Sequence, residues 1–400
     1  MLIRCYADNY RCFSSFELPL EPISVLMGPN GSGKSTVLSF LAKMRDFILG
    51  RGTSLKLFPP ETRTRWDKRI EQTFEWTLKL EHGLYLYRLR IRHEQPQRAL
   101  NKVIEESLTL DGHPLFVSND QKITLYDDSH KIRAELQPDW HISGISRIYE
   151  GRDNTKLFAF RRAVEDFLIL ALNPSLVSAE SAEREPVTIP SPDCRDFADW
   201  LLNVTTAEPL ARQEAEEKLT KGSLPGFRAF EAKSFGDANI VRCIFQGPDK
   251  PTYRLDELSS GQIALVILET AMAVANERHG ILLLDEPGNF LGLSEIQPLL
   301  TRLQDAALEG RFQVILTAHH PIAVDFLAAA HGSWLERDPS GPTRPPQRIH
   351  VTEDISADKA GMRVSDLMAR GWLSGLGVAQ TSANNDASVG TDNSNAKAHQ

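Results

Sequence analysis

The sequence has few of the features that mark secreted or membrane proteins. Its four cysteines form no C-x-x-C pair, so neither a disulfide framework nor a zinc site of common spacing is predicted. The first ten residues lack the apolar segment of a signal peptide. The longest nearly apolar stretch, residues 263–275, is interrupted by Glu269 and is too short to cross a bilayer. We therefore expect a soluble, cytoplasmic protein without membrane contact.

An excess of positive charge is also missing. The chain has 45 Lys and Arg against 53 Asp and Glu, a formal net charge of −8. This charge argues against a broad basic surface that binds nucleic acid. Residues 373–400 contain no aromatic residue and are rich in Ser, Asn, Ala, Gly and Asp, so we expect a disordered tail there. The remaining chain is long and apolar enough to build a large core.

Patterns of strands and helices fill the rest of the chain. Strands are predicted within residues 1–27, a hairpin over 73–92, and further strands near 103–110, 122–126, 227–233 and 239–246. Helices are predicted over residues 35–44, 158–172, 195–203, 207–219 and 262–277. Short apolar runs at 281–284 and 313–316 predict buried strands of a parallel sheet.

A glycine-rich loop between a predicted strand and a predicted helix fits the pattern G-x-x-x-x-G-K-[ST]. The glycines let the backbone curl so that its N–H groups face phosphate oxygens, and the helix N-terminus adds partial positive charge. We expect Lys34 to reach the β- and γ-phosphates of ATP and the Ser35 hydroxyl to bind Mg²⁺. The predicted ATP-binding residues are Gly28, Pro29, Asn30, Gly31, Ser32, Gly33, Lys34, Ser35 and Thr36.

Two carboxylates end the apolar run at residues 281–284. Asp285 follows the run directly, at the strand end where open α/β sheets bind ligands, and is predicted to hold Mg²⁺. Glu286 comes one residue later and points differently, so it is the predicted general base that polarises the attacking water. Without the phosphate loop upstream, the same residues would be equally consistent with a solvated acidic turn.

Two further motifs lie near strand or helix ends. Residues 258–262 (LSSGQ) precede the predicted helix at 262–277, where a hydroxyl, a close backbone N–H and a helix N-terminus make an anion site without lysine. The simpler alternative is a serine N-cap. His319 and His320 follow the strand at 313–316. A histidine pair also suits metal, but no third ligand is evident.

These motifs, in this order over about residues 1–372, resemble the head of ABC-type ATPases. LSSGQ resembles the LSGGQ signature, with Ser260 in place of its first glycine. Residues 9–13 (NYRCF) resemble the N-F-R-S-F stretch of the branch that holds RecF, SMC and bacterial predicted "AAA family ATPases". The chain is most similar to the short members of that branch, which lack a coiled coil.

The resemblance implies an α/β P-loop NTPase fold: one ABC-type head over residues 1–372, with a mostly parallel core sheet and an antiparallel β subdomain. The core would come from 1–157 and 255–372, and a helical insert from 158–254. It further implies a head-to-head homodimer that sandwiches ATP. His319 would contact the γ-phosphate and the attacking water, and Arg11 would approach the nucleotide. The segment that covers the partner copy's γ-phosphate would be Ser259, Ser260, Gly261 and Gln262.

The sequence departs from the family pattern in two places. Gly292 stands where a cross-dimer signalling acid is usual, which puts communication between the two sites in doubt. No glutamine clearly matches the family's nucleotide-sensing glutamine. Gln72 is a candidate, and an exposed strand residue is the alternative for it.

Two functions remain in competition at this point. The first is Mg²⁺-dependent ATP hydrolysis that drives a dimeric switch acting on DNA or a partner protein, in DNA repair or antiphage defence. The second is a slow ATP sensor that scaffolds a nuclease or toxin effector. Transport and intrinsic nuclease activity are disfavoured, because neither a membrane segment nor a D-x-D pair after His320 is present. DNA contact stays open, with solvated surface as the alternative, at Arg63, Arg65, Lys68, Arg69, Arg88, Arg90 and Arg92.

Overall fold

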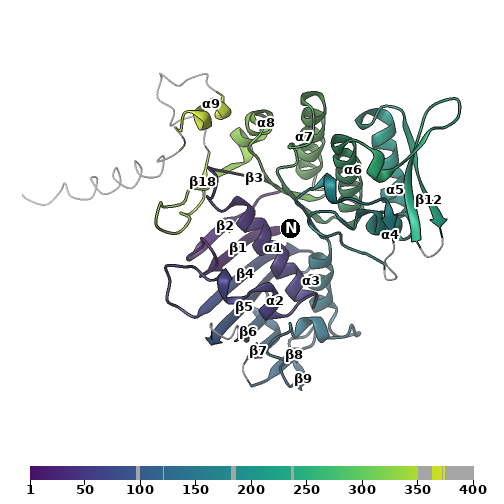
Figure 1. Cartoon of the computed structure of the whole chain (residues 1–400). Helices are drawn as coiled ribbons and strands as arrows, with labels where there is room; N and C mark the ends of the chain where they lie inside the picture. Colours follow the sequence, from purple (N-terminus) through teal and green to yellow (C-terminus); the bar gives the residue numbers. More distant parts are fainter. Residues whose placement is uncertain are drawn as a thin grey trace, which may run out of the picture.

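A computed structural model describes residues 1–95, 100–119, 121–181, 186–235, 238–349, 363–371 and 373. Apart from Leu373, the tail predicted at 373–400 lies outside these residues. No helix in the described part of the chain is long and apolar enough to cross a membrane. Within the described residues, the strands form three sheets (Figure 1).

The central sheet has the strand order β10-β15-β16-β3-β17-β18 and is parallel except for the β17–β18 pair. Three of its inner strands, β3, β15 and β16, are almost completely buried, as expected for strands covered on both faces. The sheet consists of β3 (Ile23–Met27), β10 (Phe167–Leu170), β15 (Ile281–Asp285), β16 (Gln313–Thr317), β17 (Gly332–Trp334) and β18 (Gln347–Arg348). The parallel sheet and the α/β class predicted from the sequence are therefore confirmed.

Alternate residues of these strands face two different cores, because side chains along a strand alternate between faces. On β15, Leu282 and Leu284 belong to one apolar cluster, whereas Ile281 and Leu283 belong to the other. The first cluster contains α6 (Ser260–Arg278), α7 (Leu293–Leu308) and α8 (Pro321–His331). The second contains α1 (Lys34–Ile48), α3 (Thr155–Glu165) and the antiparallel sheet. The short helices α2 (Ser54–Leu57) and α9 (Val364–Ala369) add to these layers. Leu57 of α2 packs against the second cluster, and Val364 and Leu367 of α9 belong to the first.

An antiparallel sheet forms the lower half of the molecule in Figure 1, with strand order β2-β1-β4-β5-β6-β7-β8-β9. The predicted hairpin at 73–92 is confirmed, because Leu80 pairs with Gly83 across a two-residue turn. β7 and β9 were not predicted. The strands are β1 (Leu2–Asp8), β2 (Phe16–Pro19), β4 (Glu71–Leu80), β5 (Gly83–Gln95), β6 (Leu100–Leu110), β7 (His113–Asn119), β8 (Ile123–Tyr126) and β9 (Ile132–Leu136).

The predicted helix at 158–172 is wrong in its second half. Helix α3 ends at Glu165, and Phe167–Leu170 is the edge strand β10, which pairs in parallel with Ile281–Leu284 of β15. A four-residue apolar run has no periodicity that separates a strand from a buried helix turn, and here the open edge of the sheet supplies its hydrogen bonds. β10 therefore belongs to the core sheet, and the insert that we placed at 158–254 begins after Leu170 in this fold.

The insert itself combines helices with a small sheet at the right of Figure 1. Its helices are α4 (Phe197–Ala207) and α5 (Pro209–Lys218), close to the predicted 195–203 and 207–219. The small sheet has the order β11-β13-β12, with β14 pairing with β13. Its strands are β11 (Glu180–Ser181), β12 (Phe227–Phe235), β13 (Ala238–Phe245) and β14 (Thr252–Arg254). This region leads directly into α6, and so into the LSSGQ segment at its start.

Candidate active site

The phosphate loop connects β3 to α1, as predicted. Gly28, Gly31 and Gly33 have φ values of 147°, 80° and 111°, a range that favours glycine. The Lys34 ammonium lies over the loop and donates hydrogen bonds to the carbonyls of Gly28 (2.8 Å) and Pro29 (3.1 Å). Burial lowers the pKa of Lys34, and the carboxylates of Glu286 and Asp285 oppose that shift. The lysine therefore shares a charged cluster with both predicted acidic residues.

The predicted magnesium ligands meet at the carboxyl end of the parallel sheet. Ser35 Oγ lies 3.5 Å from Asp285 Oδ1, although 250 residues separate the two. Thr317 at the end of β16 pairs in register with Asp285 and donates its hydroxyl hydrogen to Asp285 Oδ1 at 2.6 Å. Hydroxyl and carboxylate oxygens are the donors that Mg²⁺ prefers, so Ser35 and Asp285 fit this ion.

Thr317 is a site residue that the sequence analysis did not identify. It is completely buried, and its Oγ also accepts a hydrogen bond from the Glu286 N–H at 3.0 Å. One hydroxyl thus orients the Asp285 carboxylate and fixes the backbone that carries Glu286. The pairing of adjacent strand ends would have revealed this contact, had the register been known from the sequence.

Glu286 is held on both sides. Its Oε1 lies 3.2 Å from His319 Nε2, and its Oε2 accepts a hydrogen bond from Asn289 Nδ2 at 2.7 Å. Its backbone has a positive φ of 49°, an uncommon conformation for a residue with a side chain. The turn after β15 therefore directs this carboxylate towards His319 and Asn289, and its role as general base stays a prediction.

His319 is the member of the histidine pair that faces the site. Burial and then the charge of Lys34 lower its pKa, while Glu286 and Asp285 act in the opposite direction. A neutral imidazole that keeps its proton on Nε2 can donate to Glu286. His320 instead caps α8, because its Nδ1 accepts the Ile322 N–H at 3.3 Å. The described residues contain no group of three or more His, Cys, Asp and Glu that could hold a metal ion.

The LSSGQ segment starts α6. Ser259 is the N-cap, and Gln262 completes a capping box through bonds of 3.3 Å and 2.9 Å. Ser259 and Ser260 are both exposed. Gly261 is required by packing, since a Cβ there would lie 2.9 Å from the Phe290 carbonyl. Ser259 therefore does cap the helix, as the simpler alternative predicted. Both serines nevertheless stay accessible at a helix N-terminus.

The departures from the family pattern have clear structural positions. Gly292 precedes α7, and its N–H donates to Glu295 Oε2 at 2.8 Å. Gln72 is completely buried and bonds to Asn9 O (2.9 Å) and His93 Nε2 (2.9 Å). The exposed position considered for Gln72 is therefore wrong, whereas a role as the nucleotide-sensing glutamine stays a prediction.

The contacts that Arg11 makes within the described residues are with Tyr10 and Thr62, outside the phosphate loop. Its guanidinium is 5.7 Å from the centre of the Tyr10 ring, and its N–H donates to the Thr62 carbonyl at 2.6 Å. The next two residues, Cys12 and Phe13, pack against Gly33 of the loop. A role for Arg11 in nucleotide binding stays a prediction.

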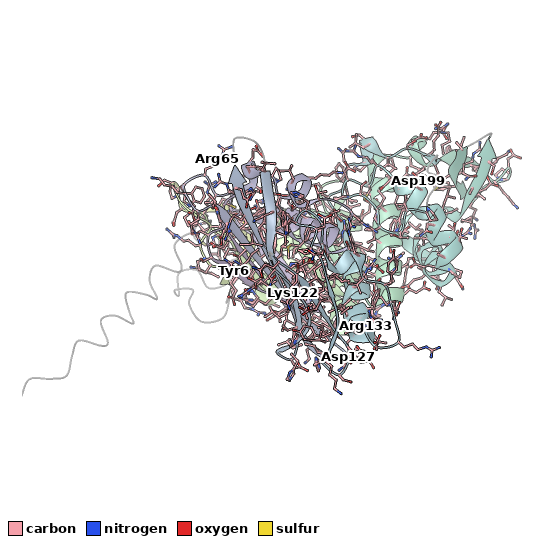
Figure 2. The ribbon with its side chains drawn as sticks, turned by 90° about the horizontal axis from the view of Figure 1, so that it is seen from below. Tyr6, Arg65, Lys122, Asp127, Arg133 and Asp199 are labelled. Carbon is pink, nitrogen blue, oxygen red and sulfur yellow. The ribbon has the colours of Figure 1, made fainter. Side chains whose placement is uncertain are left out.

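The predicted basic stripe is an ion-pair ladder across the antiparallel sheet. Arg88 pairs with Glu75 (2.6 Å), while Arg90 and Arg92 both pair with Glu71 (2.7 and 2.8 Å). In Figure 2, which shows the molecule from below, Tyr6, Lys122 and Arg133 mark the antiparallel sheet, and Asp199 marks the insert. The other predicted basic residues are Arg63, Arg65, Lys68 and Arg69. Of these, Arg69 pairs with Asp8 and Asp67. Arg65, Lys68 and Arg69 are exposed.

Comparisons with known proteins agree with this geometry. The chain is 25% identical over 345 residues to an "OLD nuclease" from Thermus scotoductus, covering 81% of this chain but 60% of that protein. It therefore spans less than two thirds of this relative.

Solved structures show the same fold at low identity. An SMC head bound to the C-winged helix domain of ScpA superposes with a TM-score of 0.53 at 11% identity, over 88% of this chain and 98% of that one. An SMC head with an extended coiled coil, bound to the C-terminal domain of ScpA from Pyrococcus furiosus, gives 0.52 at 9% identity, over 87% and 96%. The ABC-type head fold predicted from the sequence is thus confirmed. Residues 23–325 match the family described as "AAA domain, putative AbiEii toxin, Type IV TA system", and the chain belongs to this family of ATPase domains.

Proposed function

We propose that the chain hydrolyses ATP with Mg²⁺ in a site completed by a second copy, and that this cycle opens and closes a dimeric switch. The observation that carries the proposal is the convergence of Ser35, Asp285, Glu286 and His319 around Lys34. These residues come from three segments of the chain, and each has the chemistry that phosphoryl transfer to water needs.

In this proposal each residue has one task. The loop N–H groups and Lys34 hold the β- and γ-phosphates. Ser35 and Asp285 hold Mg²⁺, which offsets the charge of the phosphates. Glu286 takes a proton from the attacking water, and neutral His319 donates a hydrogen bond that keeps the carboxylate or the γ-phosphate in place. Thr317 keeps Asp285 and the backbone of Glu286 in register.

The need for a second copy is supported by the exposed start of α6. Ser259 and Ser260 stand at the N-terminus of a 19-residue helix, where the helix dipole favours an anion, and nearby Phe290 and Leu293 are 37% and 68% exposed. In the proposed dimer this surface meets the phosphate loop of the partner copy.

The test is the molecular mass in solution of the Glu286→Gln protein with and without ATP and Mg²⁺. We expect a monomer that becomes a dimer when ATP and Mg²⁺ are both present. Lys34→Ala removes the phosphate contact and Ser259→Arg blocks the exposed helix start, so either change, added to Glu286→Gln, should abolish the dimer. An unchanged mass would contradict the ATP-dependent dimer and the role given to Ser259.

A second function is favoured by one specific arrangement. Glu286 is bound by Asn289 and His319 at the same time, and Gly292 replaces the usual signalling acid, which suits a slow ATP sensor. The similarity to part of an OLD nuclease supports an effector protein, such as a nuclease, as the partner that the sensor scaffolds, in DNA repair or antiphage defence. Strong ATP-dependent dimerisation with turnover far below one per second would favour the sensor, whereas faster turnover would favour the switch.

A further inference from the structure

A segment near residue 340 lies across the phosphate loop. Strand β17 runs parallel to β3, and Leu335 extends the pairing by donating its N–H to the Met27 carbonyl at 2.7 Å. The chain then folds back, with Arg337 and Thr343 forming a β-bridge. We call residues 335–343 the strap. It lies outside residues 23–325, the part of the chain that matches the family.

The strap accounts for two glycines of the phosphate loop. A Cβ on Gly28 would lie 2.0 Å from the Leu335 carbonyl oxygen, which is backbone and cannot move aside cheaply. A Cβ on Gly33 would lie 3.2 Å from Thr343 Oγ1 and 2.9 Å from Phe13. Packing against the strap, as well as the approach of a phosphate, therefore demands glycine at both positions.

Thr343 joins three parts of the chain. Its hydroxyl donates to the Ser32 carbonyl at 2.8 Å, across 311 residues of sequence, and its N–H donates to the Cys12 carbonyl at 2.8 Å. Thr343 is 2% exposed and Ser32 is 1% exposed. Both bonds are shielded from water, where a lost partner costs more than it does at the surface.

The bond to Ser32 fixes the orientation of one peptide group. In a trans peptide the C=O and the following N–H point in opposite directions. Because the Ser32 carbonyl points at the strap, the Gly33 N–H points away from the strap. A peptide that precedes glycine rotates easily when nothing holds it.

A second observation points to a ligand in the same place. The Ser32 hydroxyl is buried and has no hydrogen-bond partner among the described residues. It lies 2.8 Å from the Cβ position of Gly28, across the loop. A buried hydroxyl normally has a partner, and an anionic oxygen held by the loop would supply one.

We infer that Thr343 is a positioning residue for nucleotide binding, whose hydroxyl keeps the Gly33 N–H directed at the nucleotide phosphates. The inference rests on the proposed binding of ATP. Thr343 does not touch the nucleotide itself, since it acts through the Ser32–Gly33 peptide. The strap thereby makes a loop within the matched family region depend on a threonine outside it.

The test measures the Kd for ADP by calorimetry, without Mg²⁺, alongside the thermal unfolding midpoint. Thr343→Val keeps the shape and removes the hydroxyl, and Thr343→Ser restores it. The matched control is Thr270→Val, because Thr270 is also fully buried and donates to a backbone carbonyl, that of Val266, at 2.8 Å. We expect Thr343→Val to weaken ADP binding about tenfold, the effect of an unsatisfied buried carbonyl. Thr343→Ser should bind like the wild type, and Thr270→Val should lose stability alone.

Unchanged ADP affinity in folded Thr343→Val would overturn the inference. Equal losses of affinity in Thr343→Val and Thr270→Val would also overturn it, because the effect would then be one of general stability. If Thr343→Val does not fold, the comparison of Thr343→Ala with Thr343→Ser tests the same hydroxyl. A wild-type protein that binds no ADP would instead contradict the proposed function itself, so the two failures are distinguishable.

Discussion

The two large sheets treat their charged side chains in opposite ways. At the end of the parallel sheet, charges from distant segments converge on one place. The carboxylates of Glu286 and Asp285 act on the pKa values of both Lys34 and His319, and Glu286 lies 3.2 Å from His319. On the antiparallel sheet, charges are spread along a ladder in which each arginine meets a glutamate of the neighbouring strand. Charges that converge on one place can act on a ligand, whereas the arginines and glutamates of the ladder already pair with one another.

The largest effect is expected at the converging site. Glu286→Gln keeps the shape of the side chain and removes the base, so we expect steady-state ATP hydrolysis to fall about 10²- to 10⁴-fold. Phosphate release measured at saturating ATP tests this, with ATP affinity measured in parallel as the control for binding. Hydrolysis at the wild-type rate would assign the base to another residue and remove the main reason for calling this end of the sheet catalytic.

A smaller loss is expected when the residue behind the carboxylates is changed. Thr317→Val removes the hydroxyl that orients Asp285, and losing a hydrogen bond that orients a metal ligand costs about 10- to 100-fold in metal affinity or activity. The Mg²⁺ concentration that gives half-maximal hydrolysis should rise. Thr317→Ser retains the hydroxyl and should remain near the wild type. If the valine variant needs no more Mg²⁺ than the wild type, Thr317 has only a packing role.

The sequence predicted the converging site better than the ladder, for a physical reason. Lys34 and Glu286 lie in short sequence motifs that predict their own surroundings. Each motif predicts a strand before it, and the motif of Lys34 also predicts a helix after it. The partners of Arg88, Arg90 and Arg92 depend on strand register, which no local pattern reveals. Thr317, Thr343 and the strand nature of Phe167–Leu170 escaped prediction for the same reason, because each is defined by a neighbour far away in the sequence.

Two adjacent glutamates on β6, Glu105 and Glu106, differ in their surroundings, and this difference predicts how stability depends on pH. Glu105 belongs to the ladder, whereas Glu106 points to the opposite face and is fully buried against Tyr87, Ser143 and the Gly144 N–H. Burial raises the pKa of Glu106 to about 7, although its hydrogen bonds oppose the shift. The folded state therefore holds a proton that the unfolded state loses near pH 4.5.

Because the folded pKa is the higher one, the contribution of Glu106 to stability is present at low pH and is lost as the pH rises through about 7. We expect Glu106→Gln to remove this dependence and to unfold at a higher urea concentration than the wild type at pH 8, by an amount on the order of 1–3 kcal/mol in unfolding free energy. Unfolding curves at pH 5.5 and pH 8 check this. The same pH slope in both proteins would show that Glu106 is ionised in the folded state.

The smallest effect is expected on the ladder itself. Arg90 contacts Glu71 and Glu105, and its side chain is 37% exposed, so solvent screens much of each attraction. Arg90→Ala should therefore lower the unfolding free energy by no more than about 1 kcal/mol and leave ATP hydrolysis unchanged. Arg65→Ala, at an exposed arginine for which the described residues supply no such ion pair, is the matched control.

Binding of duplex DNA at several salt concentrations tests whether the arginines of the ladder are fully paired with their glutamates. If Arg90 stays paired with its glutamates, the slope of log DNA affinity against log salt concentration should be the same in the wild type and in Arg90→Ala. A slope reduced by about one would mean that Arg90 leaves its glutamates and binds a DNA phosphate.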